Sequence, residues 1–345
     1  MNILHWTALL ALIALAPGTG LAGEQHILML LYRGCEEACQ SFQDYFIKHH
    51  LPVRFTLRDA AQDKTRIPGF VAEARRLKPD LVVTWGTTVT QEVAGPWRAP
   101  DPSRYLTDMP IVFMIVSNPV EAGLVPSLAS SERNLTGTLY LLDEETQLRA
   151  ARSYLDFKHL GLLVNPSEQN SLTTRDRLRQ LAPILNFQLS ERVLSVDASD
   201  KPHPDEIPGL VASLAKSGVD LLYQSPDTFL NSQRDLLTGA ALACKLPGFA
   251  SAEAPVVKSS ALMGVVNRYS EVGRMTARQA VRILFDKVSP ANIPIELPRR
   301  FSLLINMISA RQLELYPPLK LLDFAELIGD ASAPPTSLET HSLCN

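Results

Sequence analysis

The chain has 345 residues and a formal charge of −3, from 33 Lys and Arg against 36 Asp and Glu. This length suggests two domains, since a domain commonly takes about 100–200 residues. Apolar residues make up 46% and charged residues 20%, as in an ordinary packed globular protein. A near-neutral chain lacks the basic field that holds a phosphate backbone, so nucleic acid is not an expected partner. Four cysteines are too few for a disulfide framework, and the fold must rest on its own core.

The first 22 residues have the pattern of a cleaved export signal. An apolar run covers 7–16 (TALLALIALA), and Pro17-Gly18 ends it before a small-residue stretch that closes at Ala22. A run of about ten residues is too short to cross a bilayer but suits the core of a signal peptide. The segment before the run contains no Lys or Arg, and the alternative is a buried N-terminal strand. We expect cleavage after Ala22 and an exported, soluble protein, because no later segment has the pattern of a transmembrane helix.

Short apolar runs alternate with amphipathic stretches along most of the chain. We expect strands at 26–32, 53–57, 80–85, 111–116, 160–164, 193–196, 219–223, 248–250, 262–266 and 301–306. Helical patterns fall at 36–49, 67–77, 172–185, 208–217 and 269–285, and a closing helical region covers 310–327. Apolar strands separated by helices indicate parallel sheets that are covered on both faces. The sequence therefore predicts doubly wound α/β layers.

The spacing of these elements predicts two α/β units rather than one large sheet. The first series ends near 136–138, a charged segment at 143–145 opens a new helix, and a second series starts at His159. We assign 23–140 plus about 258–292 to the first lobe and 141–257 plus about 293–328 to the second. The Pro-rich segment 290–298 is expected to cross between them in an extended conformation. We expect residues 329–345, which are small and polar, to form a disordered tail.

Ligands of open α/β sheets bind beyond the carboxyl ends of the strands, where helix N-termini offer free N–H groups. Polar loops follow several predicted strands at such positions, although helix capping alone could explain any one of them. The candidate ligand-binding residues are Arg33, Gly34, Glu36, Gly86, Thr87, Thr88, Gln91, Ser117, Asn118, Pro119, Asn165, Gln224, Ser225 and Asp227.

The turn Gly86-Thr87-Thr88 is the most suggestive of these loops. Glycine lets the backbone approach a ligand closely, and two hydroxyls beside a helix N-terminus can hold a carboxylate. A phosphate is disfavoured because no phosphate-binding glycine motif is present. Gln91, one turn into the helix, could face the same space or only solvent.

Enzyme and metal-site motifs are missing from the sequence. There is no G-x-S-x-G elbow and no H-E-x-x-H pair, and the seven histidines are scattered. Cys35 and Cys39 form a local disulfide or are small residues on the first helix, and their spacing suits neither redox nor zinc motifs. Cys244 is expected in the core and Cys344 in the tail. We therefore expect no catalysis, no metal and no cofactor.

Several motifs, in this order along the chain, resemble a known family. Residues 109–140 read MPIVFMIVSNPVEAGLVPSLASSERNLTGTLY, and the block SNPVEAGLV is the most specific element. WGTTVTQ at 85–91, VNPSEQNS at 164–171, SPDTF at 225–229 and NIPIELPRRFSLLIN at 292–306 also fit. Together these motifs, spanning roughly 25–325, are similar to the periplasmic substrate-binding proteins of tryptophan/tyrosine-type ABC transporters.

The resemblance implies a periplasmic, monomeric receptor with the type I periplasmic binding fold. Its lobes would close on a small solute, such as an aromatic or other amino acid, by a shift in population. An ABC permease and an ATPase would be its partners. By hypothesis Thr87 and Thr88 hold the carboxylate, Asn165 and Ser225 close from the other lobe, and Asp227 or Glu36 meets an ammonium group. The alternative for Asp227 is that it only caps a helix and does not contact the solute.

Two departures from the family pattern point to a different solute. Asn118 stands where an acidic residue is common, and residues 260–267 replace a glycine-rich stretch at the hinge-side wall, which adds Asn267 to the candidates. Aromatic walls could come from Trp85, Phe113, Tyr223 and Phe229, or these could be simple core residues.

Three other functions remain open at this point. An exported hydrolase could use the same cleft, although no histidine falls at a strand end. A sensor domain of a repressor or chemoreceptor would need a DNA-binding or membrane segment, and neither is visible. A binding protein that serves a signalling partner rather than a permease would have the same sequence features.

Overall fold

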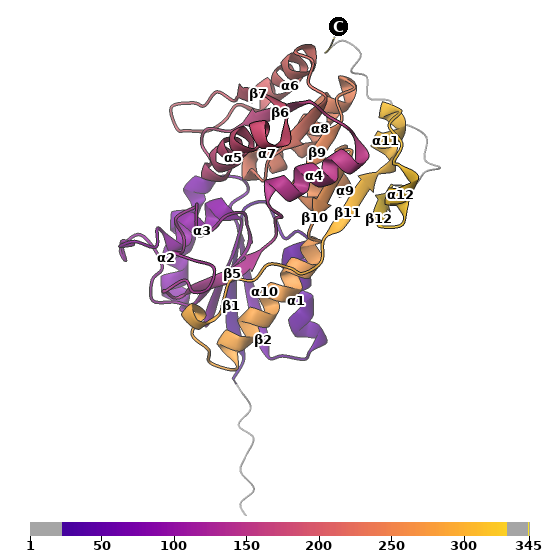
Figure 1. The fold of residues 1–345 in the computed structure, drawn as a ribbon. Helices are drawn as coiled ribbons and strands as arrows, with labels where there is room; N and C mark the ends of the chain where they lie inside the picture. Colours follow the sequence, from indigo (N-terminus) through magenta and orange to yellow (C-terminus); the bar gives the residue numbers. More distant parts are fainter. Residues whose placement is uncertain (1–22, 330–343, 345) are drawn as a thin grey trace, which may run out of the picture.

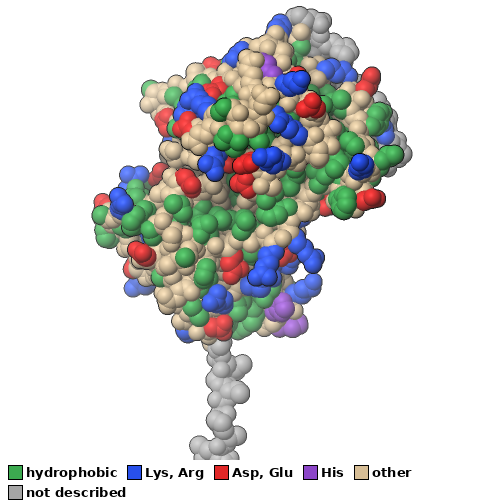
Figure 2. Space-filling model, viewed as in Figure 1, with side chains coloured by type: hydrophobic (Ala, Val, Ile, Leu, Met, Phe, Trp, Pro, Cys, Tyr) green, Lys and Arg blue, Asp and Glu red, His purple; other side chains and the backbone are tan. Residues whose placement is uncertain are grey.

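The computed structural model describes residues 23–329 and Cys344. The predicted export signal (1–22) and most of the predicted tail (330–343 and 345) lie outside the described residues. Two α/β lobes are stacked one on the other (Figure 1), and the surface narrows where they meet (Figure 2). Within the described ranges, no helix is both long and apolar enough to cross a bilayer.

The first lobe is built on a parallel sheet of five strands in the order β2-β1-β3-β4-β5. The strands are β1 (Gln25–Leu31), β2 (Val53–Asp59), β3 (Leu81–Trp85), β4 (Ile111–Val116) and β5 (Leu135–Leu139). One face is covered by α1 (Glu37–Lys48) and α10 (Tyr269–Leu284), which pack on each other. The other face carries α2 (Ile67–Leu77), which follows the short helix η1 (Lys64–Arg66), and α3 (Thr87–Ala94) (Figure 1).

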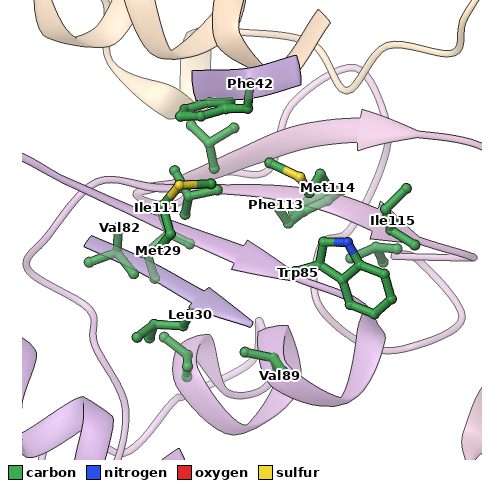
Figure 3. Close-up of a cluster of buried hydrophobic side chains, with 14 of the residues drawn as sticks. Met29, Leu30, Phe42, Val82, Trp85, Val89, Ile111, Phe113, Met114 and Ile115 are labelled. Atoms are coloured by element: carbon green, nitrogen blue, oxygen red, sulfur yellow. The ribbon is translucent and has the colours of Figure 1, made fainter. Parts of the chain in front are cut away.

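The apolar runs of the sequence explain this sheet. Strands β3 and β4 are buried at every residue, as expected where helices cover both faces. Figure 3 shows Met29, Val82 and Ile111 in the middle of the core and Trp85 beyond them, at the carboxyl end of β3. That position brings an aromatic ring from the core of the first lobe to the edge that faces the second lobe.

The second lobe contains seven strands in the order β12-β11-β10-β9-β8-β6-β7. All neighbours are parallel except β10 and β11, which are antiparallel. The strands are β6 (His159–Val164), β7 (Gln188–Val193), β8 (Leu221–Gln224), β9 (Gly248–Ala250), β10 (Met263–Val266), β11 (Ser302–Asn306) and β12 (Ala325–Ile328). The lobe's helices are α4 (Glu144–Tyr154), α5 (Gln169–Leu185), η2 (Pro204–Glu206), α6 (Ile207–Lys216), α7 (Thr228–Ser232), α8 (Arg234–Ala243), α9 (Glu253–Val257), α11 (Met307–Leu313) and α12 (Leu319–Leu322).

Helices cover both faces of the central strands of this second sheet. Leu148 of α4 and Leu178 of α5 belong to one buried cluster, whereas Val211 of α6 and Leu237 of α8 belong to another. The predicted class, two doubly wound α/β lobes, is therefore confirmed.

Within the described residues, three segments join the lobes: β5 to α4, β10 to α10, and the short helix η3 (Pro290–Asn292) to β11. The Pro-rich segment is extended, as predicted. The Leu139 N–H donates to the Glu296 carbonyl at 2.8 Å, and the Ile295 N–H donates to the Leu128 carbonyl at 2.9 Å. The segment thereby extends the first sheet beyond β5 before it crosses.

Three expectations about elements need correction. Strand β10 pairs with β9 and β11 in the second sheet, so 258–267 does not belong to the first lobe, and the chain returns to that lobe only with α10 and η3. The predicted strand 193–196 is wrong, because β7 is an edge strand of half-exposed residues that ends at Val193. Within the predicted closing helical region 310–327, Pro317 and Pro318 separate two short helices, and β12 follows them.

The cysteines form two disulfides. Cys35 is bonded to Cys39, with Cα atoms 5.2 Å apart, which selects one of the two alternatives above. Cys244 is bonded to Cys344, 100 residues further along the chain. Cys244 is therefore not a free core thiol, and this covalent link holds Cys344 against α8.

Candidate functional site

The loops that follow the strands of the two lobes face each other across a cleft. An outer cavity of about 530 Å³ lies between them. Tyr32, Thr88 and Gln91 line it from the first lobe, and Glu168 and Phe229 line it from the second. A much smaller inner cavity lies between the same lobes, lined by Arg33, Trp85, Gly86, Thr87, Ile115, Tyr140, Pro226, Thr228, Asn231 and Tyr269.

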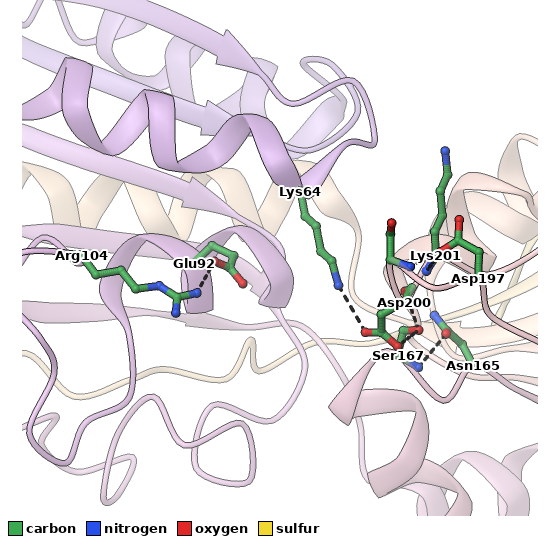
Figure 4. Close-up of polar contacts among 9 residues, drawn as sticks. Lys64, Glu92, Arg104, Asn165, Ser167, Asp197, Asp200 and Lys201 are labelled. Atoms are coloured by element: carbon green, nitrogen blue, oxygen red, sulfur yellow. Dashed lines mark hydrogen bonds and ion pairs between the residues drawn. The ribbon is translucent and has the colours of Figure 1, made fainter.

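The lobes are in direct contact around these cavities. Arg33 Nη1 donates to the Thr228 carbonyl at 3.4 Å, and Ser117 Oγ donates to the Pro226 carbonyl at the same distance. At the rim, Lys64 Nζ lies 3.3 Å from Asp200 Oδ2, and Figure 4 shows this pair spanning the gap between the lobes. This arrangement is a closed form of the cleft.

Arg33 is the buried cation of the site. Its side chain is 5% exposed, and its Nη2 lies 3.0 Å from Glu36 Oε2. Burial alone would lower the pKa of Arg33, but the Glu36 carboxylate holds that pKa above the ordinary value. The second Glu36 oxygen lies 4.0 Å from Arg234 of the other lobe. Arg33 Nε is buried without a hydrogen-bond partner.

The Gly86 turn forms the wall beside Arg33. Gly86 has φ +87°, a conformation that favours glycine, and its carbonyl accepts the Thr90 N–H at 3.1 Å. Thr87 Oγ1 accepts the Ser117 N–H at 3.3 Å, which leaves the O–H of this hydroxyl available as a donor. Gln91 Nε2 donates to the Ala122 carbonyl at 3.0 Å. Thr88 lies further out, in the lining of the outer cavity.

Strand β4 is irregular where it reaches the inner cavity. Its pairing with β5 shifts between Phe113 and Val116, and Ile115 has φ +58°. A β-branched residue in this region is strained, and such strain is often found at binding sites. The bulge turns Ile115 into the lining of the cavity.

Two carboxyl groups of the second lobe, the half-buried Glu168 and the buried Asp227, lie at the first turn of α7. Glu168 accepts the N–H groups of Thr228 at 2.8 Å and Phe229 at 2.9 Å. Asp227 Oδ1 accepts the Leu230 N–H at 2.6 Å, and Asp227 Oδ2 has no partner. Burial raises the pKa of both carboxyl groups, and the nearby Glu168 raises that of Asp227 further. Asp227 is thus the predicted helix cap and still presents a free oxygen.

The unpaired buried polar atoms around the cleft differ between the two lobes. Among the described residues, the first lobe supplies the donors Arg33 Nε and Trp85 Nε1. The second lobe supplies the acceptors Asp227 Oδ2 and Asn231 Oδ1. Because buried polar groups are normally paired, these atoms are candidates for contact with a polar ligand. The second lobe also holds the unpaired donors Asn165 Nδ2, Gln224 Nε2 and Arg234 Nε, the unpaired Ser225 hydroxyl and the unpaired acceptor Asn267 Oδ1.

The structure brings only part of the predicted site residues into the linings of the two cavities: Arg33, Gly86, Thr87, Thr88, Gln91 and Asn165. Asn118 and Pro119 line neither cavity, and their carbonyls accept N–H groups within the turn 118–125. Outside both linings as well are Gly34, Glu36, Ser117, Gln224, Ser225, Asp227 and Asn267. Of these, Ser117 and Glu36 still contact the opposite lobe. Of the predicted aromatic walls, Phe113 is in the core, and Tyr223 is also buried, with its hydroxyl donating to Gln147 Oε1 at 2.9 Å.

Several residues of the cleft are not among the candidates from sequence. Glu168 lies inside the motif VNPSEQNS, so that motif was the available signal. Tyr140 and Tyr269 lie at two of the interlobe connections, where no pattern of apolar residues marks them as cleft walls. Burial raises the pKa of Tyr140 to about 12, and its hydroxyl lies 3.4 Å from Ser117 Oγ. Within the described ranges, no cluster of His, Cys, Asp and Glu could hold a metal ion.

Comparison with known proteins identifies the family. Residues 28–327 match the model of the ABC transporter substrate binding protein family. The chain belongs to this family. Its members are solute-binding proteins rather than enzymes. A tyrosine-binding protein of Clostridioides difficile strain R20291 is 29% identical over 224 residues, which are 65% of this chain. That match spans 59% of the length of the relative.

Solved structures share the same fold. The ABC domain of a Streptococcus pneumonia protein in complex with L-Trp has a TM-score of 0.74 at 21% identity, covering 88% of this chain and 99% of that one. A conserved domain protein of Vibrio cholerae has a TM-score of 0.77, also at 21% identity, covering 89% of this chain and all of the other. The substrate-binding protein thus has the two-lobed type I periplasmic binding fold.

Proposed function

We propose that this substrate-binding protein captures an amino acid between its lobes and delivers it to the permease and ATPase of an ABC importer. Family membership and the likeness to a tyrosine-binding protein support this proposal. The observation that carries it is the pair of unpaired donors on the first lobe, Arg33 Nε and Trp85 Nε1, together with the unpaired acceptors Asp227 Oδ2 and Asn231 Oδ1 on the second lobe. A zwitterion would satisfy both sets at once.

In this proposal the solute carboxylate meets Arg33 and Trp85. A guanidinium offers several N–H donors in a plane, and a buried charged hydrogen bond is stronger than a neutral one. Thr88 lines the outer cavity and Thr87 the inner one, so the hypothesis of a carboxylate held by both threonine hydroxyls is replaced by one centred on Arg33. The Thr87 O–H can still add a donor to this site. The unpaired N–H groups at the start of α3 can still add to the site.

The solute ammonium group meets Asp227 rather than Glu36. Both oxygens of Glu36 already face arginines, at 3.0 Å and 4.0 Å. Asp227 Oδ2 is free, and Asn231 Oδ1 lies in the same helix as a second acceptor. An ammonium ion beside Asp227 would favour the ionised carboxylate, which burial otherwise disfavours.

The cavities fit a solute with a flat apolar side chain. Trp85, Tyr140 and Tyr269 surround the inner cavity, and Phe229 lines the outer one. The inner cavity holds only about 10 Å³ in this closed form, so a solute must displace the lobes to enter. The outer cavity, about 530 Å³, is within the usual range for small-molecule sites. We therefore expect binding by opening and reclosure of the lobes.

A titration with matched analogues tests the proposal. L-tyrosine and L-tryptophan are compared with tyramine, which lacks the carboxylate, and with 3-(4-hydroxyphenyl)propanoate, which lacks the amine. A bound solute at 100 times its Kd should add about 2.7 kcal/mol to the free energy of unfolding. We expect thermal stabilisation and calorimetric binding only with intact zwitterions. No stabilisation by any amino acid, or hydrolytic turnover by the purified protein, would contradict the proposal.

Transport and location rest on family membership and on the predicted export signal, which lies outside the described residues. We propose a periplasmic location and a monomeric protein. Uptake of labelled solute by cells with and without the gene tests the importer role. Intact uptake together with a lost transcriptional or chemotactic response would favour a signalling partner instead.

A further inference from the structure

A third cavity lies away from the cleft, where two of the interlobe connections pass. Its volume is about 810 Å³, and its lining comes from the start and middle of α10 and from residues 296–302. It shares no lining residue with the two cleft cavities. Figure 2 shows a group of Lys and Arg side chains over the region of α10. The charged residues of the lining are Arg268, Glu271, Arg274, Arg278, Glu296, Arg299 and Arg300.

These arginines are incompletely neutralised. Arg274 and Arg278 share one carboxylate, Glu271, at 2.6 Å and 3.5 Å. Arg268 is held by carboxylates outside the cavity lining, Glu253 at 2.9 Å and Glu326 at 3.0 Å.

Two further arginines stand without any partner. Among the described residues, Arg299 and Arg300 have neither an ion pair nor a hydrogen bond, and both are exposed. The groove therefore holds guanidinium groups in excess of its carboxylates.

We propose that this groove binds a small polyvalent oxyanion, with two or more phosphate or carboxylate groups. Guanidinium groups match the geometry of both anions and bind each through paired N–H donors. A monovalent anion could neutralise only one arginine, whereas a polyvalent one can reach from Arg274 and Arg278 on α10 to Arg299 and Arg300. The cavity of about 810 Å³ has ample room for such an anion.

Because the groove lies where the chain crosses between the lobes, an anion bound there would link the two lobes. Helix α10 packs on the first sheet, whereas residues 299–301 lead directly into β11 of the second. An anion held by both segments bridges the two lobes at their connections. This inference does not depend on the solute of the cleft, because the groove is separate from it.

Calorimetric titration of the full chain at low salt tests the site. Pyrophosphate and citrate represent the two anion chemistries, and acetate is the monovalent control. We expect pyrophosphate, citrate or both to saturate at one equivalent with a Kd below about 1 mM, and acetate not to bind measurably. Saturation by pyrophosphate alone would assign a phosphate ligand, and saturation by citrate alone a carboxylate ligand.

A charge-matched pair of variants separates a site from general attraction. Arg299→Ala with Arg300→Ala should weaken binding at least tenfold, and neither residue holds the fold by any contact described above. Arg76→Ala with Arg149→Ala removes the same charge from exposed positions, with side chains 76% and 62% exposed, and should leave binding unchanged. Equal weakening in both pairs, or no saturation with either polyvalent anion, would overturn the proposal.

Discussion

The guanidinium carbon of Arg33 lies 4.5 Å from the centroid of the Trp85 ring, so a cation from the end of β1 rests on an aromatic face from the end of β3. Such contacts are stronger when they are shielded from water, as here. The ring fixes the plane of the guanidinium, and Glu36 fixes one end of it. Arg33 Nε is thereby left as a rigid, unpaired donor inside the cleft.

Arg33→Ala should weaken solute binding by about ten- to a hundredfold, because hydrogen bonds to charged groups contribute about 1.5–3 kcal/mol. Arg33→Lys keeps the charge but loses Nε and the planar stacking on Trp85, so we expect an intermediate loss. Lys64→Ala removes another interlobe cation, but its exposed pair with Asp200 should change affinity less than about fivefold. Calorimetry with the amino acid that the analogue titration selects measures the solute affinity of all three variants. Equal losses for Arg33→Ala and Lys64→Ala would contradict the role of Arg33.

Asp227→Asn tests the acceptor side of the site. Asparagine caps helices as well as aspartate does, so the Leu230 N–H keeps its partner and the melting temperature should change little. The charge that meets the solute ammonium is lost, and we expect affinity to fall at least about tenfold. Glu36→Gln leaves Asp227 intact and should therefore reduce the solute affinity by a smaller factor. A larger effect of Glu36→Gln would move the ammonium contact to Glu36.

Much of this fold could be predicted from the sequence because buried parallel strands are apolar throughout. Strands such as β4 have no polar residue to obscure them, and β4 was predicted with its observed bounds. Edge strands are different. In β7 the two end residues are exposed and the four between them are half-buried, and β12 follows a helix-breaking Pro pair, so neither has a clear signal.

The residues of the cleft likewise divide into those that the sequence predicts and those that it does not. Residues directly after strands, such as Arg33 and Thr87, could be predicted from the rule for α/β sheets, and both line the inner cavity. Tyr140 and Tyr269 could not, because their place in the cleft depends on where the chain crosses between lobes. The bulge that turns Ile115 into the cavity is a backbone feature with no mark in the sequence.

The Cys35–Cys39 bond should stabilise both the fold and the site. It closes a short loop around Glu36, immediately after Arg33 and Gly34. Loop entropy predicts a loss of about 2 kcal/mol in the free energy of unfolding for Cys35→Ala with Cys39→Ala. We also expect weaker solute binding, since Arg33 and Glu36 would be less restrained. Denaturant unfolding and calorimetry measure the two effects. As a control, reductant added to the double variant breaks only Cys244–Cys344 and so measures the contribution of that bond alone. A double variant as stable as the native chain would contradict the prediction.

Glu253 should give the protein a pH-dependent stability near neutral pH. Burial raises the pKa of Glu253 to about 7 from an ordinary value of 4.5, against the lowering effect of the Tyr269 N–H and of Arg268. A raised carboxyl pKa means that the fold favours the protonated form. This stabilisation is complete below about pH 4.5 and is lost as the pH rises through about 7.

Glu253→Gln removes this titration. The free energy of unfolding of the variant, relative to that of the native chain, should rise by roughly 3 kcal/mol between pH 4 and pH 8. Glu326→Gln removes the other carboxylate of Arg268, which is 48% exposed, and should show no such trend. Denaturant unfolding at several pH values measures both. A flat difference for Glu253→Gln would contradict the shifted pKa.

Two glycine-to-alanine changes in helices should have opposite effects on stability. Gly273 lies where α10 crosses α1, and a Cβ there would collide with the Ala38 carbonyl oxygen and lie 3.0 Å from the Phe42 nitrogen. Both contacts are with backbone, so α10 would have to move off α1. We expect Gly273→Ala to lower the free energy of unfolding by about 1–3 kcal/mol, the usual cost of overpacking.

Gly239 is the matched control in α8. A Cβ there meets nothing within 4 Å, and alanine favours helix by up to about 1 kcal/mol over glycine. Gly239→Ala should therefore raise the melting temperature while Gly273→Ala lowers it. Because α10 and the segment after it carry two of the connections between the lobes, Gly273→Ala should also alter solute affinity, and Gly239→Ala should not. Stabilisation by Gly273→Ala would show that α10 is not seated on α1 as closely as described.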